Sequence, residues 1–242
     1  MGNFLDSTNI VKPKGLFLDS QGLFSYILSL PDLVAYYPLN ETSGDAINQA
    51  PATKGTLNGT ITGATQGVAG QVGRAYSFDG VNDQITMDLW AAVNTNITMG
   101  TICKTNDLAE GRQSIISNGG GSGGNRGYSL VINGGVTPTT DGSLFILDHF
   151  VKWVDTGYNW PDTNFHIVDL VLNSSGFPSI FVDGIQKYSS GSVTFSSANT
   201  TSAIGMDLGL GFMNGKIQHA YILNQALANG NRLKIARIAR LA

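Results

Sequence analysis

Short apolar runs separated by turn residues make up most of the chain after residue 32. The runs are rich in β-branched and aromatic residues and recur roughly ten residues apart, with no helical stretch between them. They lie at 33–39, 74–80, 84–89, 97–104, 113–117, 128–132, 143–154, 165–172, 179–188, 192–195 and 203–206. Gly- and Asn-rich clusters such as 118–127 separate them. The pattern predicts an all-β fold, an antiparallel sandwich or barrel.

One charged residue breaks an otherwise apolar strand face. Strand periodicity puts Phe165, Ile167, Asp169 and Val171 on the same side of run 165–172. A carboxylate on a buried face conflicts with the cost of removing an unpaired charge from water. The alternative is that this strand is covered on its opposite side.

The two ends of the chain carry a helical pattern instead. Residues 20–29 place aliphatic side chains at helical spacing, and Pro31 is expected to end that helix. Aliphatic residues repeat at similar spacing in the last turns of the chain, which predicts a C-terminal helix. We therefore divide the chain into an N-terminal arm, 1–31, and one domain, 32–242, that ends in a helix.

Composition narrows the classes of protein. The chain has 242 residues, of which 42% are hydrophobic and only 13% charged, so it can bury a substantial core and is not an intrinsically disordered tail. It has no apolar stretch long enough to predict a transmembrane helix. A formal net charge of −3 argues against a nucleic-acid binder. With a single cysteine, Cys103, neither an internal disulfide nor a cysteine metal site is expected.

Groups that carry catalysis are scarce. The chain has only two glutamates, Glu41 and Glu110, far apart in sequence, and no strand with the paired carboxylates of a glycosidase. The three histidines, His149, His166 and His219, stand alone on predicted strands, outside any metal-ligand spacing. The sequence therefore predicts a protein that is not an enzyme.

Five segments occur in a recognisable order. They are 33–46, 55–64, 73–87, 165–186 and 203–227. They supply an aromatic first strand with an acidic-Ser-Gly turn, a G-T-L stretch, an F-D-G-x-x-D hairpin, a V-D-G hairpin and an N-G-K-I ending. Together they resemble the laminin-G-like, concanavalin-A-like jelly-roll family, of the kind found in phage virion proteins. The resemblance implies a two-sheet antiparallel jelly-roll sandwich with an N-terminal arm and a short C-terminal helix.

Some members of that family bind calcium or sugar at the rim of the sandwich. On this resemblance, Asp79, Asn82 and Asp83 are the candidate calcium ligands, since hard cations prefer clustered carboxylate and amide oxygens. The alternative is that these side chains only stabilise a tight hairpin turn. Apart from calcium, no cofactor is expected.

The segment 151–162 holds three aromatic residues, Trp153, Tyr158 and Trp160. Aromatic rings that face solvent can stack on sugar rings, so these three are the candidate glycan-binding residues. The alternatives are that they pack a loop against the sandwich or fill a subunit interface.

Two terminal features predict contact with a partner or with further copies of the chain. The arm is strongly apolar, and its candidate contact residues are Phe17, Leu23, Phe24 and Ile27. No acid follows Asp207, and the basic residues Arg232, Arg237 and Arg240 of the terminal helix would meet an acidic surface. The alternatives are an arm docked on its own domain and a solvated basic helix face that complements the helix dipole.

The resemblance, together with an N-terminus that lacks the pattern of a secretory signal, favours a structural protein of a virus particle. A capsid decoration, tail or fibre component of a phage would assemble in the host cytoplasm, reside in the virion, and contact other virion proteins or its own copies. The alternative is a carbohydrate-binding or adhesion module of a bacterial surface protein. The two interpretations are compatible if the virion protein also binds surface glycans.

Overall fold

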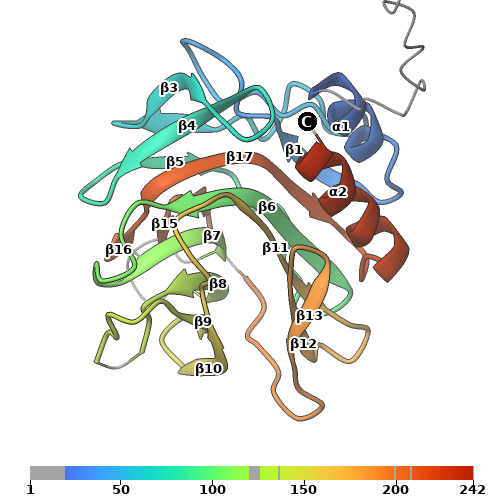
Figure 1. The fold of residues 1–242 in the computed structure, drawn as a ribbon. Coiled ribbons are helices and arrows are strands. Elements are labelled where there is room, and N and C mark those ends of the chain that lie inside the picture. The colour runs from blue at the N-terminus through green and yellow to red at the C-terminus, as the bar shows by residue number, and fades with distance from the viewer. Residues whose placement is uncertain (1–19, 120–125, 136, 199, 208, 242) are drawn as a thin grey trace, which may run out of the picture.

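The computed structural model describes residues 20–241 apart from 120–125, 136, 199 and 208. Two antiparallel sheets dominate it, with two helices on one side (Figure 1). Phe17, one of the predicted partner contacts, lies outside the described residues.

Sheet I has its strands in the order β13-β12-β11-β6-β17-β4-β3, and β1 also pairs with β17. In chain order its members are β1 (Leu33–Tyr37), β3 (Thr65–Ala69), β4 (Arg74–Asp79), β6 (Ile97–Thr105), β11 (His166–Leu172), β12 (Pro178–Val182), β13 (Ile185–Ser189) and β17 (Asn214–Leu223).

Sheet II has its strands in the order β10-β9-β8-β7-β14-β5-β2. Its members are β2 (Thr60–Thr62), β5 (Gln84–Met87), β7 (Gln113–Gly119), β8 (Gly127–Ile132), β9 (Ser143–Asp148), β10 (Lys152–Asn159) and β14 (Ser202–Ile204). A small hairpin of β15 (Met206–Asp207) and β16 (Gly211–Phe212) packs against β7.

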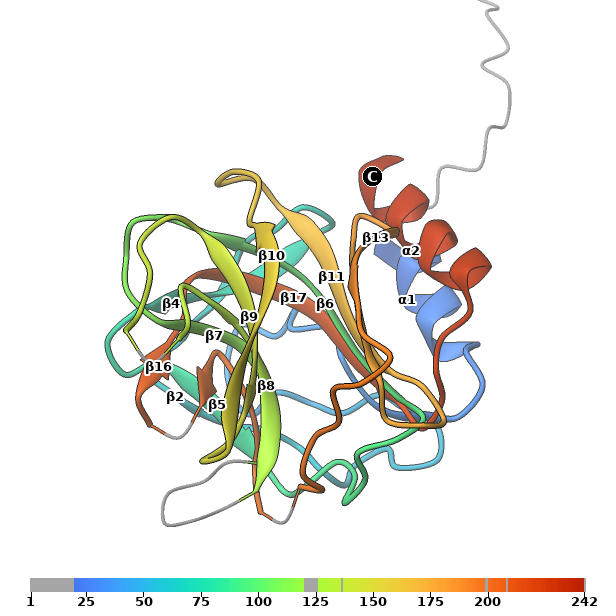
Figure 2. The ribbon, with the colours of Figure 1, turned by 90° about the horizontal axis from the view of Figure 1, so that it is seen from below.

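The two sheets face each other across one hydrophobic core, so the predicted all-β, antiparallel two-sheet sandwich is confirmed (Figure 2). Alternate residues of the predicted runs fill this core, as strand periodicity requires. Two runs differ from the prediction. Residues 143–154 form two strands, β9 and β10, joined by a turn in which Phe150 has a φ of 60°. Residues 192–195 form no strand.

Helices α1 (Ser20–Leu28) and α2 (Asn229–Leu241) cover the outer face of sheet I and pack against each other (Figure 2). They close a second hydrophobic core, which we call the helix core. Leu23 and Ile27 are fully buried in it, so the prediction that they contact a partner is wrong. Sheet I is apolar on both faces, and the apolar side of α1 is used to cover the second face.

Two more of the predicted partner contacts also serve this core. Phe24 is half-buried, and its ring centroid lies 5.6 Å from that of Tyr36 in β1. Arg232 is 5% exposed, and its guanidinium lies 3.6 Å above the Phe181 ring and donates to the Leu227 carbonyl. The prediction that Arg232 meets an acidic partner is therefore wrong, because its guanidinium is held at the start of α2, against Phe181 of sheet I.

Asp169 lies in the helix core, which resolves the conflict in its strand. The carboxyl is fully buried, and Tyr221 Oη donates to its Oδ1 at 2.5 Å. Burial raises the pKa of Asp169 to about 6, while the hydrogen bond from Tyr221 and the nearby Arg232 charge act against that rise. Both faces of β11 are covered, one by sheet II and the other by the helices, so neither face of this strand is open to solvent.

Candidate functional site

The β4–β5 hairpin holds the candidate calcium ligands in turn contacts. Asp79 Oδ1 accepts hydrogen bonds from the amides of Val81 and Asn82, at 2.8 and 3.2 Å. Asp83 is buried, and its Oδ2 accepts the Asp79 amide at 2.9 Å. The Val81 amide contributes most to lowering the pKa of Asp79. Gly80 supplies the left-handed conformation, with a φ of 81°.

These contacts fit the turn alternative better than a metal site. The hairpin's own amides already occupy one oxygen of each carboxylate. Within the part of the chain that the structure describes, no group of three or more His, Cys, Asp and Glu side chains could hold a metal ion. The donor set of this hairpin does not fit a calcium ion.

Trp160, one of the candidate sugar-stacking residues, is 2% exposed and packs edge-on against His166 with ring centroids 5.5 Å apart. The prediction that it stacks on a sugar is therefore wrong, because neither indole face reaches solvent. Tyr158 is half-buried against the inter-sheet core, with the Lys187 ammonium 5.1 Å from its ring centroid.

Trp153 packs against different residues from the other two aromatics. It is half-buried on β10, edge-on to Phe145 at a centroid distance of 6.0 Å. The Arg112 guanidinium lies 4.9 Å from the Trp153 ring centroid and pairs with Asp207. The described contacts thus hold the three predicted aromatics in place by packing, and they do not form one platform.

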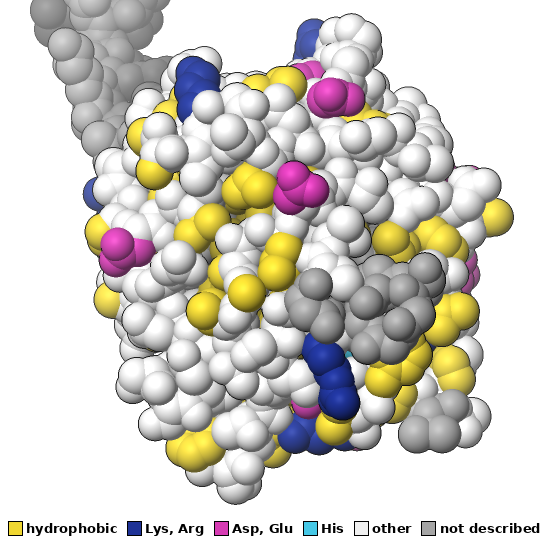
Figure 3. Space-filling model, turned by 180° about the vertical axis from the view of Figure 1, so that it is seen from behind, with side chains coloured by type: hydrophobic (Ala, Val, Ile, Leu, Met, Phe, Trp, Pro, Cys, Tyr) yellow, Lys and Arg dark blue, Asp and Glu magenta, His cyan; other side chains and the backbone are white. Residues whose placement is uncertain are grey.

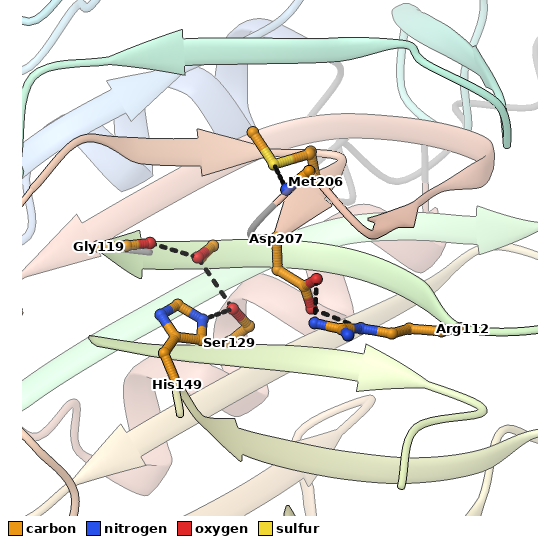
Figure 4. Close-up of polar contacts among 8 residues, drawn as sticks. Arg112, Gly119, Ser129, His149, Met206 and Asp207 are labelled. Carbon is orange, nitrogen blue, oxygen red and sulfur yellow. Dashed lines mark hydrogen bonds and ion pairs between the residues drawn. The ribbon is translucent and has the colours of Figure 1, made fainter. Parts of the chain in front are cut away.

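A buried polar chain crosses β7 and β8 beside the Arg112–Asp207 pair (Figure 4). Ser117 Oγ donates to the Gly119 carbonyl at 2.7 Å and accepts from Ser129 Oγ at 2.9 Å. His149 Nε2, 2.5 Å from Ser129 Oγ, is then the donor at the start of this chain. Protons therefore point away from His149, the wrong direction for a base that activates a serine.

Burial also keeps His149 out of catalysis. The residue is fully buried, and desolvation lowers its pKa to about 3, so the imidazole is neutral at pH 7. Its Nδ1 has no hydrogen-bond partner among the described atoms, so no third group orients the ring. The serine–histidine contact is a structural one.

His166 forms the centre of a partly exposed ionic cluster. Its Nδ1 lies 2.9 Å from Asp183 Oδ2 and its Nε2 lies 3.1 Å from Asp162 Oδ1. Arg240 of α2 adds a 2.8 Å ion pair to the same Asp183 oxygen. Burial alone would lower the pKa of His166, but the hydrogen bonds to Asp183 and Asp162 outweigh it and raise that pKa above 6.5.

This cluster should make stability depend on pH. A raised pKa in the folded state means that His166 stabilises the fold below pH 6.5, and that this contribution disappears as the pH rises through the folded-state value. We expect His166→Gln to lower the free energy of unfolding by roughly 1 kcal/mol more at pH 5.5 than at pH 9. Urea denaturation of both proteins at both pH values measures this difference. An equal loss at the two pH values would contradict the assignment.

A cleft of about 460 Å³ lies beside α1, and we call it the α1 cleft. One wall is the first turn of α1, with Ser20, Gln21 and Phe24. The rest of the lining includes Asn40, from the segment after β1, and Arg74, which follows the β3–β4 turn. The volume lies in the range of small-molecule sites.

Rigid aromatic packing forms the floor of the α1 cleft. His219 of β17 lines it, and its Nδ1 lies 2.7 Å from Tyr36 Oη. The two rings are stacked, with centroids 6.0 Å apart, and the Phe24 ring makes a tilted contact with Tyr36. Burial lowers the pKa of His219 to about 4, so the floor is uncharged at neutral pH. His219 has a φ of 51° at an irregularity in the β17–β6 pairing.

The rim of the cleft is polar and has spare hydrogen-bonding groups. Asn40 and Arg74 are exposed and Gln49 is half-buried, and all three line the cleft. Within the described residues their side chains have no hydrogen-bond partner. The lining includes no Asp or Glu. Sequence reasoning missed this site because its members come from separate segments, and the side chains of Asn40 and Arg74 are not among those that carry the resemblance of segments 33–46 and 73–87.

No protein-family model matches the chain, and no curated protein matches its sequence. Solved structures do share its fold. Domain 4 of AbnA, a GH43 extracellular arabinanase from Geobacillus stearothermophilus solved with arabinotriose, matches 85% of this chain and 98% of its own, at 21% identity and a TM-score of 0.65. Trypanosoma rangeli sialidase matches 89% of this chain at 12% identity and a TM-score of 0.64.

The receptor binding domain of botulinum neurotoxin D matches 85% of this chain at 14% identity and a TM-score of 0.60. The chain covers 36% of the sialidase chain and 52% of the toxin chain. At these identities the likeness establishes the fold, a jelly-roll β-sandwich, and agrees with the fold that the sequence resemblance implied.

The face of the molecule seen in Figure 3 is poor in charge: most of it is backbone and uncharged side chains, with isolated acidic and basic groups. Neither α1 nor α2 is long and apolar enough to cross a membrane.

Proposed function

We propose that the chain is a non-enzymatic carbohydrate-binding module that holds a glycan in the α1 cleft. The observation that carries the proposal is the lining of this cleft, where the Phe24 ring stands beside unpartnered amide and guanidinium groups. Sugars present apolar C–H faces and many hydroxyls, and aromatic rings with fixed polar groups complement both. The arabinotriose-bound arabinanase domain and the toxin receptor binding domain support this choice of ligand class.

The positions of the glutamates support the absence of catalysis. Glu41 accepts hydrogen bonds from Tyr76 Oη at 2.8 Å and the Ile47 amide at 3.2 Å. Glu110 accepts one from the Asn214 side-chain amide. Each carboxylate is thus used in local structure, whereas glycoside hydrolysis needs two that face one sugar bond.

We further propose that this module belongs to a virus particle, as a decoration, tail or fibre component. The segment 25–45, similar to the lead-in of laminin-G-like domains in phage virion proteins, supports this setting. The docking of Leu23 and Ile27 on the chain's own sheet removes one reason for expecting self-association. Antibody labelling of purified particles tests the setting: gold on the particle surface supports it, and labelling confined to bacterial surfaces favours the alternative.

Glycan binding is tested with a glycan array and with calorimetry on the strongest ligand found there. The double variant Asn40→Ala/Gln49→Ala removes two amides from the cleft rim. We expect at least about a tenfold loss of affinity, since each hydrogen bond to a sugar hydroxyl is worth about 1 kcal/mol.

The matched control is Asn224→Ala/Gln186→Ala, two exposed amides outside the cleft lining. It should bind as the original protein does. An array with no bound glycan would remove the proposed function. Full affinity in the cleft variant would place the sugar site elsewhere, with Trp153 the next residue to test.

A further inference from the structure

Arg74 is the only charged side chain that lines the α1 cleft in the described structure. It is the first residue of β4, it is exposed, and its guanidinium makes no ion pair or hydrogen bond with the described residues. Arg112 and Arg240, by contrast, form ion pairs, with Asp207 and Asp183 respectively. No carboxylate of the described residues therefore pairs with the Arg74 guanidinium.

Glu41 follows the lining residue Asn40 but forms no ion pair with Arg74. Its two oxygens instead accept hydrogen bonds from Tyr76 Oη and from the Ile47 amide. His219 on the floor is neutral at pH 7, so it adds no second charge of either sign. The cleft thus presents one positive charge, the unpartnered amides of Asn40 and Gln49, and the Phe24 ring.

On this basis, and resting on the proposed function, we infer that the α1 cleft selects an acidic saccharide, one that carries a carboxylate or a sulfate. A guanidinium offers a planar fork of donors that matches either anion with two parallel hydrogen bonds. Asn40 and Gln49 then reach ring hydroxyls, and Phe24 contacts the apolar face of the sugar.

If Arg74 contacts the anion directly, another basic side chain should not replace it fully. A lysine keeps the charge but loses the paired donors, so Arg74→Lys should bind the acidic sugar more weakly than the original protein and more tightly than Arg74→Gln. A charge that acted only by long-range attraction would give equal binding for Arg and Lys.

The test uses an array of matched glycan pairs that differ only in one carboxylate or one sulfate, with the full chain, Arg74→Gln and Arg74→Lys. The expected result is at least about tenfold stronger binding of the acidic member by the full chain, and loss of that preference in Arg74→Gln. Arg237→Gln removes the same charge from an exposed position on α2 and should keep the preference.

The outcomes separate this inference from the proposed function. Equal binding of acidic and neutral members, or a preference that survives Arg74→Gln, would overturn the acidic-saccharide inference while leaving a glycan-binding module in place. A blank array would overturn the proposed function itself. Preference for the carboxylated or the sulfated member of a pair identifies which anion the cleft takes. Melting temperatures of the variants within a degree or two of the original confirm that binding, not folding, has changed.

Discussion

Gly100→Ala is expected to lower the free energy of unfolding by about 3 kcal/mol or more. Gly100 lies in the middle of β6, and a Cβ there would overlap Asp169 Oδ1 and the Tyr221 ring in the helix core. Both neighbours are fully buried and bonded to each other, so neither can move aside without breaking that contact. The shift in the midpoint of urea denaturation measures the effect.

Gly191→Ala is the matched control. A Cβ at residue 191 meets no atom within 4 Å, and the residue does not adopt the left-handed conformation. This variant should change stability by less than about 1 kcal/mol. Similar denaturation midpoints for the two variants would show that Asp169 and Tyr221 do not pack over Gly100 in this way.

Leu23→Ala should lower the free energy of unfolding by about 3 kcal/mol, because it opens a cavity in the helix core. Leu23 is fully buried where α1 meets α2 and sheet I. The same denaturation experiment measures the loss, and faster amide hydrogen exchange in α1 should accompany it.

Leu233→Ala makes the same change on α2, at a side chain that is 53% exposed. It should lower the free energy of unfolding by less than about 1 kcal/mol. If Leu23→Ala were as mild as this control, α1 would not be docked on the domain. Its apolar side would then again be a candidate partner contact, as the sequence suggests when taken alone.

The strand pattern predicts the sandwich well because alternation reports directly on which side chains face the core. Run 165–172 shows where this reasoning stops. The alternation correctly predicts which side chains of this run share a face. A single sequence window cannot show, however, that helices from both ends of the chain cover the second face, or that Tyr221 donates a hydrogen bond to Asp169. Those contacts depend on tertiary structure.

The candidate site was less predictable from the sequence. The turn residues beside Trp160 predict an exposed aromatic side chain, yet Trp160 is buried and packs against His166. The side chains of Arg74 and Asn40 are not among those that carry the resemblance, and they become a site only when β4 and the segment after β1 are brought beside α1. Aromatic content in a loop is therefore a weak guide to a sugar site, compared with unpartnered polar groups around a cavity.

The pairing of β1 with β17 has a mechanical consequence. Leu33, where β1 begins, lies opposite Leu223, where β17 ends, so the two strands leave the sheet at the same edge. A pull between the two ends of the chain would open this pair one hydrogen bond after another, as a zipper opens, rather than load all the bonds at once.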